Sequence, residues 1–325
     1  MWVYIVRRLL YTPLIVVGVL LVTFTLFNLV QGDISAQIAG KNASPQVIAE
    51  IRHEYGWDKP LFFNPGQMKE SGIRGLFDSQ FFNHFYNAIR FDFGRNLAKQ
   101  KVSTLITQGA GPSLSLMLPM FFGLLVTSIS VSLFIAHKRG TWADTSLVVL
   151  CVIGMSMPAL AVIIYCQYFF AYELGWFPIH GYTSGIGGAK YFVLPVLIGV
   201  VMGLGGDVRF YRTVMLDEIH ADYIRTAYAK GVSTRRVLFV HLLKNAMIPI
   251  ITTVVLSIPF LFLGSLLLER FFGIPGLGYL MVEAIGSRDF QVINAMTYIY
   301  ALLFIFGQLL TDICYAIVDP RVSLN

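Results

Sequence analysis

The feature that most constrains this chain is a series of long apolar runs separated by polar segments. The runs lie at 9–30, 113–136, 145–171, 191–206, 247–268 and 292–318. A run of about 18 or more apolar residues is long enough to cross a bilayer as a helix. Only 13% of the residues are charged, whereas soluble domains carry about 25%. The sequence therefore predicts an all-α polytopic membrane protein with six transmembrane helices.

The first apolar run could instead be the core of a cleaved signal peptide. Such a core extends over about 7–15 residues, and the run at 9–30 is longer. Arg7 and Arg8 precede it without the flanking context of a twin-arginine export signal. We therefore interpret 1–30 as a short N-terminal segment followed by an uncleaved first helix.

The distribution of Lys and Arg predicts the orientation of the helices. Of the 24 Lys and Arg residues, 12 lie in the segments 1–8, 137–143, 207–245 and 317–325, and three lie in the two short loops on the opposite side. The long segment 31–112 is left out, because loops beyond about 60 residues do not follow the rule. Short cytoplasmic loops carry the excess of basic residues, so both termini are expected inside. The net charge of +6 then reflects these loops and does not imply nucleic-acid binding.

The chain shows no pattern of a catalytic or metal site. It lacks a Gly-x-Ser-x-Gly elbow, a His-Glu-x-x-His motif and the Gly-x-x-x-x-Gly-Lys-Ser/Thr phosphate loop. The cysteines Cys151, Cys166 and Cys314 lie inside apolar runs, which favours buried small hydrophobes over a disulfide or a zinc site. We expect no catalytic residue, no metal and no cofactor in this chain.

A polar, charge-rich segment at 217–249 stands between two apolar runs. Its middle, 221–230, predicts a short helix that ends at Gly231, because glycine accepts the left-handed conformation that terminates helices. Ser233 is then placed to cap a second helix that continues into the next apolar run. The short helix could be only a solvated connector, since about ten residues are marginal for a helix on its own.

The residues of this segment carry a family resemblance. The stretch Asp222-Tyr-Ile-Arg-Thr-Ala-Tyr-Ala-Lys-Gly231, followed by His241 and Asn245-Ala246, resembles the cytoplasmic EAA loop of permease subunits in ABC importers. It resembles more narrowly the B-type permease of the oligopeptide/dipeptide family. In that family this loop is a coupling helix that docks in a groove on the ATPase subunit.

The segment departs from the general EAA pattern at two places, with Arg225-Thr226 where Glu-Ala is usual and with a late closing proline, Pro249. Both departures resemble the peptide-permease version. The resemblance implies ATPase coupling by Asp222, Tyr223, Ile224, Arg225, Thr226, Ala227, Tyr228, Lys230 and Gly231. Ile224, Ala227 and Tyr228 would enter the partner's groove, the charged residues would fix the orientation at its edge, and Gly231 would set the angle to the next helix.

A second match lies near the fifth and sixth apolar runs. Gly264 and Glu269, the turn Pro275-Gly-Leu-Gly278 and the triplet Arg288-Asp-Phe290 resemble the family's glycine–glutamate spacing, PGLG turn and RDY signal. A Pro-Gly-Leu-Gly stretch cannot stay in a regular helix, and irregular backbone at membrane depth must be buried in protein or line a watery cavity. We expect an outer gate or receptor-facing group formed by Glu269, Pro275, Gly276, Gly278, Arg288 and Asp289. Interfacial anchoring is the alternative for the charged residues.

The C-terminus carries the third match, Asp312-Ile-Cys-Tyr315 with Asp319-Pro-Arg321. Asp312 is the one acidic residue well inside a predicted span, where a charge costs about 2.5–3.5 kcal/mol. A structural bond to Tyr315 or to a loop is favoured over an ion-relay role. Weaker matches lie in the long polar segment, whose Phe-rich insert at 64–87 has no counterpart that we identify.

Together these matches imply the permease half of a binding-protein-dependent ABC importer for peptides, with the type I (MetI-like) fold, in a bacterial inner membrane. The expected organisation is 1–30 with the first helix, a periplasmic insert at 31–112, a core permease domain at 113–318 with the coupling loop 207–245 and the gate segment 269–291, and a cytoplasmic tail at 319–325. The pathway would use bends at Pro119, Pro158 and Pro259.

The implied partners are a homologous second permease in a heterodimer, two ATPase subunits that bind the ATP and Mg, a periplasmic solute-binding protein, the peptide and membrane lipid. The chain itself is expected not to be an enzyme and not to bind nucleic acid. The same scaffold could import a nickel chelate, an oligosaccharide or an antimicrobial peptide. An ion-coupled carrier is disfavoured because central spans lack several charges, and an intramembrane enzyme because the catalytic set is missing.

Overall fold

The computed structural model describes all residues except 1, 32–34, 36–38, 41–42, 55 and 319–325. The described residues form helices joined by turns, and the one pairing of extended backbone among them is an isolated bridge between Arg95 and Lys101. The all-α prediction is confirmed. The predicted tail at 319–325, with its Asp-Pro-Arg match, lies outside the described residues.

The chain forms two compact units. One is built mainly on Gly109–Tyr279, and the other consists of Val6–Gln108 and Leu280–Ile305. Four helical stretches in the described part of the chain are long and apolar enough to cross a membrane, or five if one bent pair counts as a single span. They lie at Val102–His137, Lys190–Ile219, Thr234–Leu263 and Phe290–Ile313, with the bent pair at Trp142–Ser156 and Ala159–Glu173.

The first helix, α1 (Trp2–Gln31), carries a shorter apolar stretch at Leu10–Leu26. Six spans with both ends in the cytoplasm are compatible with this set of helices and stay a prediction.

Two of the spanning helices are longer than the apolar runs that predicted them. The helix α7 (Val102–His137) begins before the predicted 113–136, and α10 (Lys190–Ile219) continues beyond the predicted 191–206. Hydropathy reports the part of a helix that lies in hydrocarbon, whereas the helix itself continues wherever the backbone can keep its hydrogen bonds. A part of each predicted polar segment therefore belongs to a long helix.

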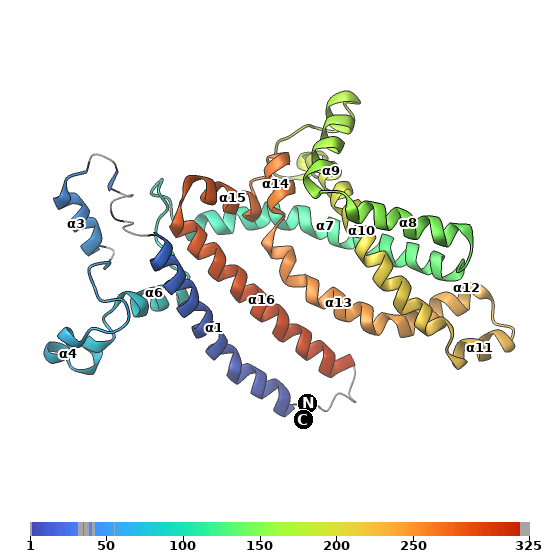
Figure 1. The fold of residues 1–325 in the computed structure, drawn as a ribbon, viewed down its shortest axis with the longest axis horizontal. Coiled ribbons are helices and arrows are strands. Elements are labelled where there is room, and N and C mark those ends of the chain that lie inside the picture. Colours follow the sequence, from blue (N-terminus) through green and yellow to red (C-terminus); the bar gives the residue numbers. More distant parts are fainter. Residues whose placement is uncertain (1, 32–34, 36–38, 41–42, 55, 319–325) are drawn as a thin grey trace. The chain divides into compact units, whose positions relative to one another are not determined.

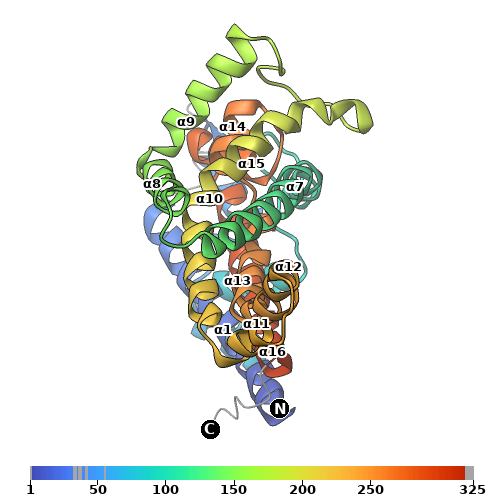
Figure 2. The same ribbon diagram turned by 90° about the vertical axis from the view of Figure 1, so that its right-hand side faces the viewer.

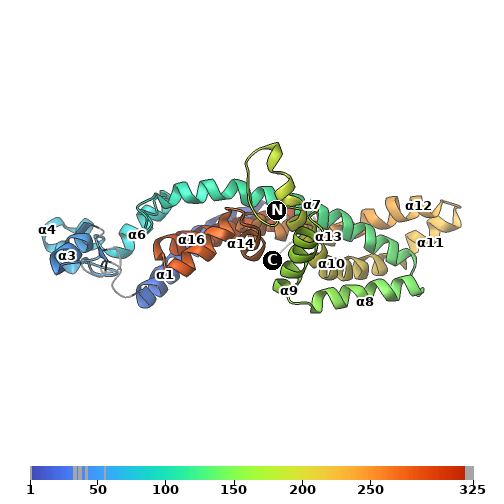
Figure 3. The same ribbon diagram turned by 90° about the horizontal axis from the view of Figure 1, so that it is seen from above.

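The predicted third span is divided at Pro158. The helix α8 (Trp142–Ser156) and the stretch formed by α9 (Ala159–Cys166) and a π-helical turn, Gln167–Glu173, meet at 98° (Figure 3). Proline lacks an amide hydrogen and disfavours a helical conformation at the residue before it, and Met157 is extended. The helices α7 and α13 (Leu243–Leu263) run uninterrupted through Pro119 and Pro259, where bends stay a prediction.

In the first unit, α10 packs beside α8 and α13 (Figure 1). The short helices α11 (Asp222–Ala229) and α12 (Thr234–Arg236) follow α10 and lie next to the helical segment that leads into α13 (Figure 2). The chain then continues through α14 (Leu266–Phe272) and α15 (Leu277–Ser287) to α16 (Phe290–Val318). The order of helices therefore places the predicted coupling segment directly between two long spanning helices.

The second unit contains α1, the first part of α16 and the short helices of the polar segment. These short helices are α3 (Pro45–Glu54), α4 (Pro65–Ser71), α5 (Ile73–Leu76) and α6 (Gln80–Ile89). Ser44 accepts from the Val47 amide and Gly56 follows with φ +69°, as the sequence predicted for the start and end of α3. An ion pair between Lys59 Nζ and Asp78 Oδ1, 2.6 Å apart, holds together the two ends of the segment that contains α4 and α5.

Candidate functional site

The helix α11 has the limits that the sequence predicted. It begins after Ala221, whose backbone is extended, and it ends at Lys230. Gly231 follows with φ +74°, and its amide donates to the Tyr228 carbonyl at 2.9 Å. This conformation is costly for residues with a Cβ atom, so the glycine is what allows the chain to reverse here.

The chain continues from Gly231 through two non-helical residues into the helical stretch that begins at Thr234. Ser233 takes the position before α12, although its side chain makes no capping hydrogen bond. A π-helical turn at Val237–Leu242 then joins α12 to α13. The predicted second helix is therefore present, whereas the predicted side-chain cap by Ser233 is wrong. The backbone connects α11 to α13 through the short non-helical link 231–233 and then through continuous helical turns.

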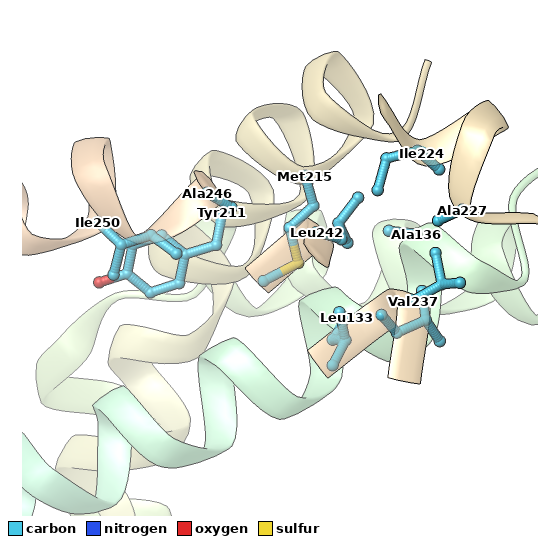
Figure 4. Packing of buried hydrophobic residues seen from close by; sticks show 11 residues of the cluster. Leu133, Ala136, Tyr211, Met215, Ile224, Ala227, Val237, Leu242, Ala246 and Ile250 are labelled. Atoms are coloured by element: carbon cyan, nitrogen blue, oxygen red, sulfur yellow. The ribbon is translucent and has the colours of Figure 1, made fainter. Parts of the chain in front are cut away.

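The inner face of α11 is buried against the chain's own helices. Ile224 and Ala227 are 1% and 6% exposed. They belong to one apolar cluster, called here the coupling cluster and shown in Figure 4. Its buried members are Leu133, Ala136, Tyr211, Met215, Ile224, Ala227, Val237, Leu238, Leu242, Ala246 and Ile250. The cluster therefore joins α11 to α7, α10 and α13.

This packing corrects one expectation from the sequence. Ile224 and Ala227 are not available to enter a groove on another protein, because their side chains already contact this chain. Amphipathicity shows that one face of a helix is covered, and it does not show which partner covers it. A helix this short needs tertiary packing to be stable, and the coupling cluster provides it.

The outer face of α11 is open to solvent and carries aromatic and charged side chains. Tyr223 and Tyr228 are 36% and 44% exposed, and Arg225 and Lys230 are also exposed. The Tyr223 hydroxyl donates to Glu218 Oε2 at 2.5 Å. Burial and this neighbouring carboxylate raise the pKa of Tyr223 to about 12, so its hydroxyl stays neutral at physiological pH. This face, and not the Ile224 face, is the surface that a partner can reach.

A partly buried ion pair joins α8 to α10 in the same unit. Arg212 Nε and Nη2 contact the two carboxylate oxygens of Asp144, each at 2.9 Å, and the Gly140 amide donates to Asp144 Oδ2 at 3.0 Å. Asp144 is 5% exposed. Sequence reasoning missed this bidentate contact, which fixes α8 against the helix that leads to α11. The signal in the sequence was an acidic residue at the start of the third apolar run.

The outer turn is organised around Glu269, whose side chain is 0% exposed. Its Oε1 accepts from the Ser113 hydroxyl at 2.7 Å and from the Ser265 amide at 3.1 Å. Its Oε2 accepts from the Tyr279 amide at 3.0 Å. The Ser113 hydroxyl also accepts from the Leu277 amide at 2.7 Å. This Glu269 network therefore ties α7 to the starts of α14 and α15.

Burial raises the pKa of Glu269, and the hydrogen bonds from Ser113 and from backbone amides act in the opposite direction. The amides of Ser265 and Tyr279 lie at the N-terminal ends of α14 and α15, where backbone N–H groups favour a carboxylate. The Glu269 network thus gives the buried side chain its hydrogen-bond partners from two helix ends and one hydroxyl.

The glycines of the outer turn make room for this carboxylate. A Cβ atom at Gly264 would lie 2.3 Å from Glu269 Oε1, and one at Gly276 would lie 2.3 Å from Oε2. A Cβ atom at Gly278 would lie 2.8 Å from the Ser265 carbonyl carbon. The glycine–glutamate spacing and the Pro-Gly-Leu-Gly stretch are therefore two halves of one packing arrangement.

The predicted outer group is only partly exposed. Pro275 and Arg288 face solvent, whereas Glu269, Gly276, Gly278 and Asp289 are buried. The role of the six residues as an outer gate or receptor-facing group stays a prediction, and the buried members have their polar atoms turned toward the protein. Asp289 accepts from the Leu97 amide at 3.0 Å in the second unit. Sequence reasoning identified Glu269 with its glycines and missed Ser113.

Among the described residues, no group of three or more His, Cys, Asp or Glu side chains is arranged to hold a metal ion. The side chain of Tyr315 lies outside the described residues, so the suggested bond between Asp312 and Tyr315 stays a prediction.

Comparison with known proteins gives matches over almost the whole chain. Residues 128–324 match the family described as "Binding-protein-dependent transport system inner membrane component", and residues 1–106 match its N-terminal companion family. A putative peptide transport system permease protein of Brucella abortus is 34% identical over 312 residues, with 94% of each chain covered. A probable peptide ABC transporter permease protein of Sinorhizobium fredii is 33% identical, with 99% of each chain covered. A glutathione transport system permease protein of Shigella flexneri is 33% identical, with 98% of each chain covered.

Proposed function

Because the chain belongs to the family of binding-protein-dependent transport system inner membrane components, we propose that it is the permease subunit of an ATP-driven importer for peptides. It is a multi-pass inner-membrane protein and a permease component of an ABC transporter. Two of the relatives described above are named for peptide transport and a third for glutathione transport. Glutathione is itself a small peptide, so the three names support one substrate class.

In this proposal α11 is the helix through which partner ATPases move the permease. The observation that carries it is the coupling cluster, in which Ile224 and Ala227 are buried together with residues of α7, α10, the π-helical turn Val237–Leu242 and α13. A displacement of α11 should be passed on, because its inner face is buried in a cluster that includes residues of α7, α10 and α13, and α11 contacts the turn that leads into α13. The ATPase would contact the opposite face, which carries Tyr223, Tyr228 and the exposed cations Arg225 and Lys230.

The complete importer in this proposal has one homologous second permease as a heterodimer partner, two ATPase subunits and a periplasmic solute-binding protein. The ATPases bind the ATP and the Mg. Closure of the ATPase pair would draw the coupling helices together and open the pathway toward the docked binding protein, which is an alternating-access mechanism. The outer turn held by the Glu269 network would form part of the outer gate.

The coupling proposal is tested by Gly231→Val in the reconstituted importer. A β-branched residue at φ +74° strains the backbone by about 1–3 kcal/mol, and no atom lies within 4 Å of the position. We expect membrane insertion to persist and the peptide transported per ATP hydrolysed to fall.

The matched control is Gly175→Val, which has φ +62° and also has no atom within 4 Å. It carries the same backbone strain in a loop remote in sequence from α11, so it should leave coupling intact. Unchanged transport per ATP in Gly231→Val would sink the coupling proposal. The substrate is tested separately by identifying what co-purifies with the cognate binding protein. If only a non-peptide solute stimulates ATP hydrolysis in the reconstituted complex, the peptide assignment fails.

A further inference from the structure

The helix α6 has three distinct sides. At 3.6 residues per turn, residues three, four and seven apart share a face of a helix. Phe81, Phe85 and Ala88 therefore lie on one side, and the polar residues Gln80, Asn83 and Asn87 lie on the opposite one. Phe82, Tyr86 and Ile89 form a third side between them. The helix thus has two apolar sides, whereas a helix that packs on a protein core needs only one.

The first side of α6 is covered within the second unit. Ala88 is buried with Leu20 of α1 and Tyr298 of α16 in one apolar cluster, and Phe85 packs against it. The rings of Phe81 and Phe24 lie 5.4 Å apart. These contacts hold α6 against the flanks of two long apolar helices.

The third side of α6 is covered only at Phe82, which is half-buried, and is open at its other two residues. Tyr86 and Ile89 are each 54% exposed. The ring of Phe82 lies 4.7 Å from that of Phe77 and 6.0 Å from that of Phe63, and both of these phenylalanines are exposed. We call Phe63, Phe77, Phe82, Tyr86 and Ile89 the α6 patch. Contiguous exposed apolar groups of this kind mark an interaction surface.

The contacts of α6 place this patch beside apolar stretches of the two long helices. Leu20 lies within the apolar stretch Leu10–Leu26 of α1. Tyr298 lies in the candidate span Phe290–Ile313, eight residues after its first residue, which corresponds to about 12 Å along a helix. A helix packed against the outer part of two apolar stretches is close enough to the bilayer for its exposed side to reach the zone of headgroups and upper acyl chains.

The composition of the patch also fits the membrane interface. Phenylalanine and tyrosine rings are suited to this zone, and a basic side chain beside them can extend toward the headgroups. The Arg90 guanidinium lies 4.0 Å from the centre of the Tyr86 ring, at the border between the apolar and polar sides of the helix. Exposed apolar residues of α1, among them Leu21, Val22 and Leu26, supply further surface of the same kind in this unit.

We propose that the α6 patch binds the bilayer, with α6 lying in the membrane interface at which α16 begins. Tyr86 and Ile89 then contact the upper parts of the acyl chains, and the exposed Asn87 faces water. The Phe-rich insert thereby becomes an anchor that holds the polar segment against the membrane. This assignment concerns lipid as the occupant, and a protein partner on the same face is the alternative that the test separates.

The test uses a nitroxide spin label at single cysteines in the assembled importer, reconstituted in phospholipid bilayers. The native cysteines are first replaced by alanine, and labels are placed in turn at Tyr86→Cys, Ile89→Cys and Asn87→Cys. At each position the frequency of collision between the nitroxide and dissolved oxygen, which concentrates in lipid, is compared with its frequency of collision with a water-soluble nickel chelate. Asn87 is the matched control, because it is an exposed residue of the same helix on the polar side.

We expect oxygen to dominate at positions 86 and 89 and the nickel chelate to dominate at 87. Nickel accessibility at 86 and 89 equal to that at 87 would place the patch in water and overturn the proposal. Protection from both reagents at 86 and 89 would show a protein partner on this face and would also overturn it. The two patch positions are read independently, so a label that prevents assembly at one site leaves the other decisive.

Discussion

Replacement of Glu269 by alanine tests whether the outer turn depends on its buried carboxylate. The change leaves the Ser113 hydroxyl and the amides of Ser265 and Tyr279 without their acceptor. Each unsatisfied buried donor costs about 1–3 kcal/mol, and water entering the vacated space recovers part of this cost. Because three donors lose their acceptor and water recovers part of the loss, we expect Glu269→Ala to lower the free energy of unfolding by about 3–5 kcal/mol.

The measurement is thermal unfolding of the purified importer in bilayer discs, followed by intrinsic fluorescence. Glu283→Ala is the matched control, because Glu283 is exposed on α15 and its loss should change stability by no more than about 0.5 kcal/mol. Ser113→Ala should fall between the two, since it removes one hydroxyl and leaves the carboxylate in place. If Glu269→Ala and Glu283→Ala unfold at the same temperature, the Glu269 network does not stabilise the turn and the reasoning is refuted.

Three further predictions follow from the same unit. Burial raises the pKa of Glu269, so the folded protein binds a proton at this carboxyl more tightly than the unfolded chain does. The stability that this proton contributes is therefore full below the ordinary glutamate pKa and is lost as pH rises through the raised pKa of the folded state. Glu269→Gln should remove this dependence of stability on pH. Melting temperatures of the parent protein and the variant, measured between about pH 4 and 8, check the prediction, and the same change of melting temperature with pH in both proteins would contradict it. Asp144→Asn should destabilise the protein by about 1.5–3 kcal/mol, because the half-buried Arg212 loses a charged hydrogen-bond partner. A double-mutant cycle with Arg212→Met measures the coupling, and additive effects would contradict it. Ile224→Ala should lower the free energy of unfolding by about 2–5 kcal/mol. Tyr228→Ala should change it by no more than about 0.5 kcal/mol and should weaken binding of the ATPase subunits in a pull-down assay. If Ile224→Ala weakens ATPase binding without loss of stability, the Ile224 face is the docking surface and the reasoning is wrong.

The main architectural features could be predicted from local sequence because they depend on local physics. Apolar length indicates a spanning helix, and Gly231 marks the end of α11 because few residues accept its conformation. The division of the third span at Pro158 follows in the same way from the chemistry of proline. Helix ends were less predictable, since α7 and α10 extend through residues that hydropathy reads as polar loop.

Features that depend on contacts between distant residues were not accessible to the same reasoning. Ser113 and Glu269 are 156 positions apart, and Asp144 and Arg212 are 68 positions apart. Nothing local in either residue indicates its partner. The direction in which Ile224 faces has the same origin, because an amphipathic pattern is satisfied equally by a partner protein and by the chain's own helices.

The crowding around Glu269 limits how this turn can change over generations. An alanine at Gly264 or Gly276 would drive a methyl group onto a carboxylate oxygen at 2.3 Å. A shorter aspartate would make room but would draw its oxygens away from the amides of Ser265 and Tyr279. Each of these single exchanges is therefore expected to destabilise the turn, and the Ser113 hydroxyl, which a Cβ atom at Gly276 would meet at 2.4 Å, restricts the glycine further. Among related chains, these positions should be inherited together or replaced together.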